Sequence, residues 1–128
     1  MMIGTATGLL TVCITHESSE DVIAQASDRF DIVRASTMNG LEAALERSGS
    51  THILVEGLLE TLYDPRVLTR EAARALGRVK LRLEALASSG VEVVVVCERR
   101  RHDLGTRCHF LNSLCASADR VVTDLLAA

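Results

Sequence analysis

The chain has 128 residues, of which 48 % are apolar, a length that suits one domain with a sizeable core but not two. It contains no Trp, one Tyr and two Phe, so the core must be aliphatic and few aromatic side chains remain to stack on bases or sugars. A net charge of −3 argues against a general affinity for polyanions, so nucleic-acid contact would need a local basic patch.

The first half of the chain alternates apolar segments with capped amphipathic ones. Residues 8–15 predict a strand, and a capping-box pattern predicts a helix over about 18–29. A short strand is expected at 30–35. A second capping signal predicts a helix over about 39–48.

The central part of the chain predicts a strand, a long helix and a second strand. The apolar run 52–59 is interrupted by Glu56, where the strand is expected to leave the sheet. An Asp-Pro pair and Gly90 bracket an amphipathic helix over about 65–89. The β-branched run 91–96 does not alternate, which is typical of a strand covered on both faces.

The remaining segments complete an α/β pattern. A polar loop is expected at 98–107, a short helix at about 110–115 and a last strand at 119–125. Strands that alternate with helices predict a three-layer sandwich with a five-stranded parallel sheet. With right-handed crossovers, the strand order expected is 2-1-3-4-5.

The sequence predicts a cytosolic protein made of a single α/β domain, residues 1–128. Its apolar runs are too short to span a membrane, and its start lacks the basic region of a signal peptide. The four cysteines are therefore expected to be thiols. Lys80 is the only lysine among 14 basic residues and amides are few, a bias that would also suit a thermophile.

The order of the segments resembles the ATPase core of the RecA superfamily, and it is similar to archaeal RadA recombinases. The stretches that carry the resemblance are GLLTVCITHESSEDVIAQASDRF, FDIVRASTMNGLEAAL, HILVEGL, VEVVVV and SADRVV. The resemblance puts Glu17 at the catalytic glutamate, Glu56 where the Walker B strand has Asp, and Cys97 where a polar sensor stands. It implies a P-loop type of sheet, with residues 99–107 near a DNA-contacting segment.

The chain departs from this family at its phosphate loop. Triphosphate binding requires G-x-x-x-x-G-K-[ST], and no such motif occurs in the chain, whose only lysine lies within the long helix. The resemblance implies that the phosphate-loop strand has been lost, which would leave the last two strands side by side. The unpaired edges of the sheet then predict a homodimer or a complex with a full-length relative.

Part of the sequence, FDIVRASTMNGLEAAL followed by HILVE, also resembles a two-component receiver domain, which is flavodoxin-like and has the order 2-1-3-4-5. Receivers need an acidic pair, an Asp and a Lys at three strand ends. The corresponding positions here hold His16-Glu17, Glu56 and Thr123-Asp124. Phosphorylation is therefore not expected even if the fold is shared.

The candidate site residues follow the ends of the expected strands. A relic or ligand site would combine His16, Glu17, Glu56 and Cys97, with the two glutamates either acting as an acid–base pair or simply solvated. The cysteines and histidines lack zinc-site spacing, so no metal is expected. A thiol nucleophile would lack an oxyanion-forming glycine turn.

Two groups of arginines are candidates for anion binding. One recurs every four residues along the long helix, where a solvated face partly paired with Glu71 and Glu84 is expected. The other crowds the loop after the fourth strand and would contact phosphates: Arg99, Arg100, Arg101 and Arg107.

The sequence thus predicts a truncated RecA-like paralogue without ATPase activity or cofactor. It would act as a protein-interaction or regulatory module in recombination or repair. Its expected partners are a second copy or a full-length RecA-like protein, with weak nucleic-acid binding and no membrane. The alternatives are a small enzyme or ligand-binding domain at the carboxyl edge of the sheet, and a degenerate receiver-like domain.

Overall fold

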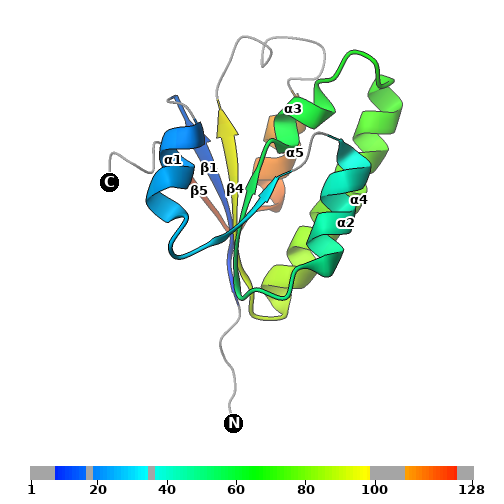
Figure 1. Ribbon diagram of the computed structural model, residues 1–128. Coiled ribbons are helices and arrows are strands. Elements are labelled where there is room, and N and C mark those ends of the chain that lie inside the picture. Colours follow the sequence, from blue (N-terminus) through cyan, green and yellow to red (C-terminus); the bar gives the residue numbers. More distant parts are fainter. Residues whose placement is uncertain (1–7, 17–18, 35–36, 99–108, 124–128) are drawn as a thin grey trace.

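The computed structural model describes residues 8–16, 19–34, 37–98 and 109–123. In this part of the chain, strands and helices alternate as an α/β fold requires (Figure 1). The strands are β1 (Leu10–Thr15), β2 (Asp31–Arg34), β3 (His52–Glu56), β4 (Glu92–Glu98) and β5 (Arg120–Thr123). The helices are α1 (Ser19–Ala26), α2 (Met38–Arg47), α3 (Leu58–Leu62), α4 (Thr69–Ser88) and α5 (His109–Ser117).

The five strands form one parallel sheet in the order β2-β3-β4-β1-β5. The expected order 2-1-3-4-5 is therefore wrong, and the receiver-like interpretation loses the topology on which it rests. The last two strands are not side by side, because β1 separates β4 from β5. The expected and the observed order both put β2 and β5 at the edges of the sheet. The apolar pattern therefore identifies the interior strands but not the order in which they lie.

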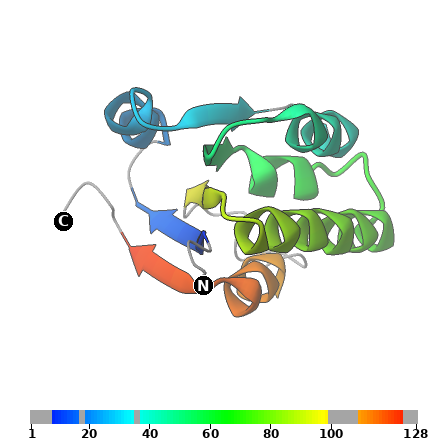
Figure 2. The same cartoon turned by 90° about the horizontal axis from the view of Figure 1, so that it is seen from below.

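Helices cover both faces of the sheet, which makes three layers (Figure 2). Of the described helices, α1 alone packs on one face, where Val22, Ile23 and Ala26 contact strand residues such as Val94 and Val96. Helices α2, α3, α4 and α5 cover the other face and enclose the larger core. This arrangement follows from right-handed crossovers, because the chain moves one way across the sheet from β1 to β2 and the opposite way afterwards.

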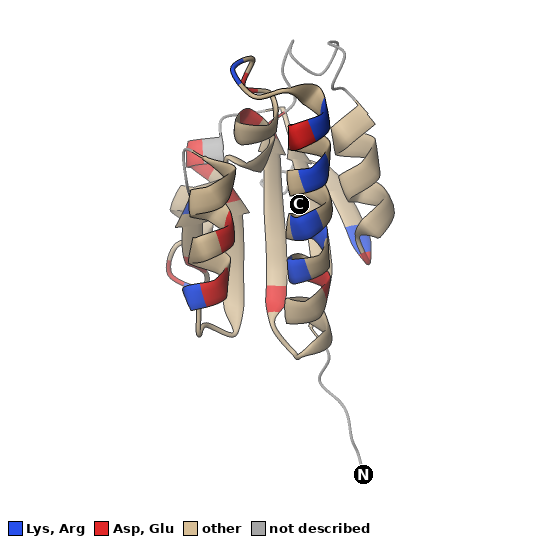
Figure 3. Ribbon diagram, turned by 90° about the vertical axis from the view of Figure 1, so that its right-hand side faces the viewer, with Lys and Arg blue, Asp and Glu red and all other residues tan. Residues whose placement is uncertain are grey.

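The larger helical layer is centred on α4, which contacts α2 on one side and α5 on the other (Figure 3). Its buried residues recur at three- and four-residue steps, as the sequence predicted: Ala72, Ala75, Leu76, Val79, Leu83 and Ala87. The opposite side of the helix is exposed. In the described part of the chain, no helix combines the length and apolarity needed to cross a membrane.

The helix α4 begins at Thr69, four residues later than expected. The reason is that the Asp64-Pro65 pair makes a turn and not a helix start. The Val67 amide donates to the Asp64 carbonyl oxygen at 3.1 Å, and the Arg66 amide donates to the Asp64 carboxylate at 2.9 Å. Asp followed by Pro favours this turn as strongly as it favours a helix start.

The end of α4 agrees with the sequence. Gly90 has φ 105°, a left-handed conformation that suits glycine. The Gly90 amide donates to the Ala87 carbonyl and the Val91 amide donates to the Leu86 carbonyl, the paired bonds of a Schellman motif. The chain therefore leaves α4 in a fixed direction and enters β4 directly.

Strand β3 ends where the sequence predicted, but a short helix that the sequence did not predict follows it. The strand ends at Glu56, and Gly57 adopts a left-handed conformation with φ 88° before the short helix α3 begins. Helix α2 also begins earlier than expected, because Thr37 and not Asn39 is its N-cap. The Thr37 hydroxyl accepts a hydrogen bond from the Gly40 amide at 3.1 Å.

Gly8 lies where the backbone before β1 meets the backbone before β4. A Cβ atom on Gly8 would stand 1.9 Å from the Val91 carbonyl oxygen, so any side chain here forces two backbone segments apart. We expect Gly8→Ala to lower the free energy of unfolding by about 2–3 kcal/mol. Gly49→Ala is the matched control, because its Cβ would meet nothing within 4 Å, and it should change stability by less than about 0.5 kcal/mol.

Urea denaturation of both variants measures these changes. Equal stability of Gly8→Ala and Gly49→Ala would contradict the close approach of the two backbones at Gly8 and Val91.

Candidate functional site

The candidate site lies at the carboxyl edge of the sheet, between β1 and β4. The chain leaves β1 toward α1 on one face of the sheet and leaves β4 toward α5 on the other face. The connections from these two neighbouring strands therefore run in opposite directions across the sheet. Ligands of open α/β sheets bind in the crevice at such a point. Thr15 at the end of β1 is the register partner of Glu98, which ends β4, and exposed His16 follows directly.

Several of the predicted site residues lie outside the described part of the chain. They are Glu17 and, in the predicted arginine loop, Arg99, Arg100, Arg101 and Arg107. Their predicted roles stay predictions. Of the predicted ligand-site residues, the structure describes His16, Glu56 and Cys97.

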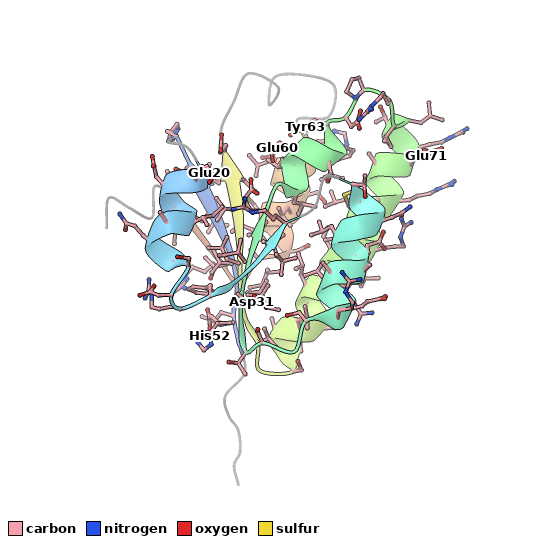
Figure 4. The ribbon with its side chains drawn as sticks, in the orientation of Figure 1. Glu20, Asp31, His52, Glu60, Tyr63 and Glu71 are labelled. Carbon is pink, nitrogen blue, oxygen red and sulfur yellow. The ribbon has the colours of Figure 1, made fainter. Side chains whose placement is uncertain are left out.

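Glu56 ends β3 and forms an ion pair with Arg34, its register partner on β2. The distance from Arg34 Nε to Glu56 Oε1 is 3.7 Å, and Arg34 Nη1 lies 3.9 Å from the carboxylate of Glu20 on α1. Figure 4 shows Glu20 on α1 near this end of the sheet. The Glu56 side chain is only 20 % exposed, so its carboxylate stands in a charged cluster against the α1 face.

Cys97 does not join this cluster. Successive side chains of a strand point to opposite faces of the sheet, and Cys97 shares its face with Val93 and Val95 in the larger core. Glu56 and Arg34 are on the α1 face. Cys97 is 1 % exposed and belongs to the larger apolar core, and such burial suits a structural thiol better than an accessible nucleophile.

A hollow formed by the end of β3, by α3 and by the Asp64-Pro65 turn was not predicted from the sequence. It has a volume of about 490 Å³ and is lined by residues 56–57, 60–61 and 63–66. Asp64 binds Arg66 there through two hydrogen bonds of 3.0 and 3.1 Å, and these bonds raise the pKa of the Arg66 guanidinium. The sequence signals for this hollow are Gly57 and the Asp64-Pro65 turn, which together allow the short helix.

The cysteines and histidines do not build a metal centre in the described part of the chain. No group of three or more His, Cys, Asp or Glu side chains there could hold a metal ion. Cys13, Cys97 and Cys115 are thiols, as expected, while His102 and Cys108 lie outside the described residues.

Comparisons with known proteins assign no family to this chain. No known protein family matches it, and neither the curated proteins nor the solved structures include a significant match. Functional inference therefore depends on the residues and on the fold.

The burial of Cys97 can be tested by its reactivity. We expect iodoacetamide to modify Cys97 and Cys13 at least about tenfold more slowly than Cys115 in the native protein, because reaction of a buried thiol requires local opening. Peptide mapping by mass spectrometry measures the three rates separately. Unfolding in urea should make the rates similar. If native Cys97 reacted faster than Cys115, an activated thiol at the carboxyl edge would replace the structural role.

Proposed function

We propose that the chain is a RecA-like module without ATPase activity that acts by binding other macromolecules. The observation that carries this proposal is the short connection after β1. Only three residues, 16–18, join Thr15 at the end of β1 to Ser19 at the start of α1. They include neither glycine nor lysine, so they cannot supply the cradle of amides and the charge that a triphosphate requires.

The strand order supports a revised alignment with the RecA core. The resemblance implies that loss of the phosphate-loop strand would leave the last two strands side by side. In the RecA core, the phosphate-loop strand therefore lies between those two strands. Here β1 separates β4 from β5. We infer that β1 corresponds to the phosphate-loop strand and that the three-residue connection after it stands where that family has its loop. On this alignment Glu17 does not correspond to the catalytic glutamate.

The charges near the carboxyl edge also favour a non-catalytic role. Lys80, the only lysine, lies on α4 and donates to the Ser113 hydroxyl at 2.9 Å, within the helical layer. It is thus held against α5 and not at the strand ends. The Glu56 carboxylate already faces Arg34. A small enzyme using Glu56 with Cys97 is less well supported, because the two side chains point to opposite faces of the sheet.

The proposed partners are a second copy of the chain or a full-length RecA-like protein, in recombination or repair. This biological setting comes from the resemblance. Weak binding of single-stranded nucleic acid is part of the same proposal, because four arginines crowd the sequence between β4 and α5.

Calorimetry with Mg-ATP tests the non-catalytic role. We expect a dissociation constant weaker than about 1 mM, because the amides and the lysine that balance phosphate charge are missing. Lys80→Ala is the matched control and should leave any weak heat of ATP binding unchanged. In a working phosphate loop, by contrast, the lysine is required for binding the triphosphate. Micromolar affinity for ATP would overturn the proposal.

Titration with a fluorescent single-stranded oligonucleotide tests the arginine loop. Neutralising roughly three or four phosphates should give a log–log salt slope of about −2 to −3. Changing Arg99, Arg100 and Arg101 together to Ala should abolish binding at low salt without lowering thermal stability. As the control, Arg29→Ala with Arg47→Ala removes two exposed arginines that lie away from the arginine loop and should have little effect. If the wild-type chain fails to bind at low salt, the nucleic-acid role is excluded.

A further inference from the structure

The outer face of α4 is a ridge of exposed side chains on the larger helical layer. Arg70, Gly77 and Leu81 lie within roughly 40° of each other around the helix axis, opposite the buried row. Leu81 is 69 % exposed, the largest value among the exposed large apolar residues of the described chain. Figure 3, which views this layer from outside, marks basic residues in blue on successive turns of α4.

The arginines along this helix fall into two groups. Arg78 and Arg82 form ion pairs with Glu42 and Glu46 on α2, at 2.9 and 3.1 Å. The hydrogen bonds that Arg78 donates to the Glu42 carboxylate raise the pKa of the Arg78 guanidinium. These pairs tie α4 to α2. The partners are therefore not Glu71 and Glu84 of α4 itself, which the sequence suggested.

The second group is Arg70 and Arg74, which form no ion pair with any described residue. Glu84, near the other end of the same helix, likewise has none. The outer face thus carries two unmatched positive charges in its first half, an exposed leucine near its middle and an unmatched negative charge near its end.

This distribution is complementary to itself when two helices run antiparallel. A two-fold axis beside Gly77 brings Arg70, seven residues before it, level with Glu84, seven residues after it, of the other copy. It also brings Leu81 level with Ala73. Gly77 has no side chain, and a Cβ placed there would meet nothing within 4 Å, so the two helices can approach closely at the axis.

We propose that the outer face of α4 binds the same face of a second copy, antiparallel and centred on Gly77. Each copy then places Leu81 against Ala73 and Gly77 of the other, which buries apolar surface that water now contacts. Two symmetric Arg70–Glu84 contacts flank this centre, each about 10 Å from the axis. The inference gives a surface to the homodimer of the proposed function and does not depend on the nucleotide role.

The edges of the sheet are weaker candidates for the same contact. Both edge strands, β2 and β5, have four residues. Short edge strands and charged edge residues are the means by which proteins prevent edge-to-edge pairing. Asp31 and Arg34, at the two ends of β2, supply such charges.

The contact area sets the expected strength of the dimer. One helix face covers roughly half of the about 800 Å² per partner that a stable interface buries. We therefore expect a reversible dimer with a dissociation constant between about 10 μM and 1 mM. Sedimentation equilibrium over this range of protein concentration measures it directly. A chain that stays monomeric throughout the range would overturn the proposal.

Substitution of exposed leucines tests the surface. Leu81→Glu should raise the dissociation constant more than about tenfold, because each dimer loses two apolar contacts and gains two buried charges. Leu68→Glu is the matched control, since Leu68 is also exposed, at 56 %, but precedes the helix and lies off the outer face. A dimer that Leu81→Glu leaves intact, or that Leu68→Glu weakens as much, would overturn the assignment to this face.

Charge reversal tests the antiparallel alignment. Arg70→Glu and Glu84→Arg should each weaken the dimer about tenfold, because each creates two like-charge contacts. The double variant should restore wild-type affinity. Both reversals place a charge that interacts favourably with the dipole of α4, so neither should unfold the helix. A loss of dimer affinity would therefore not be explained by unfolding of α4. If the double variant stayed as weak as the singles, the alignment on Gly77 would be wrong. Neither result changes the outcome of the ATP calorimetry. The proposed dimer surface and the proposed role without ATPase activity can therefore be overturned independently.

Discussion

The fold depends on how the first strand is held between two partners that are distant in sequence. The Val93 amide donates to the Leu9 carbonyl oxygen at 2.9 Å, which fixes β4 on one side. On the other side, Leu10 and Asp119 bond reciprocally. The Leu10 amide donates to the Asp119 carboxylate, and the Asp119 amide donates to the Leu10 carbonyl, both at 2.8 Å. With β1 fixed in this way, both faces of the sheet can be covered and the two cores form.

These contacts explain why the sequence predicted the fold class but not the strand order. Apolar patterning separates β1, β3 and β4, which are buried, from β2 and β5, which are short and exposed. It carries no information on which buried strands are neighbours, since all three present apolar side chains to both faces. The features that place β1 beside β4 and β5 are a single glycine, Gly8, and a single carboxylate, Asp119. Neither is distinctive in a sequence.

The candidate site was predictable to a similar degree. Parallel strands end at one edge, so grouping His16 and Glu56 at that edge follows from the element order alone. The side of the sheet to which each residue points depends on the exact strand register. A shift of one residue along a strand moves a side chain to the opposite face. Glu56 is the register partner of Val96, so it points away from Cys97, the next residue of β4. The pairing of Glu56 with Arg34 likewise depends on β2 lying beside β3.

The distribution of charge links the structural and functional arguments. A chain with net charge −3 gains little from long-range attraction to polyanions, so its recognition must depend on local groups. On α4, Arg78 and Arg82 are matched by acids of α2 and serve the fold. Arg70 and Glu84 have no such role within the described chain, and exposed charges that do not pair contribute little to stability. Their spacing about Gly77 is the observation on which the proposed antiparallel contact between two copies of α4 depends.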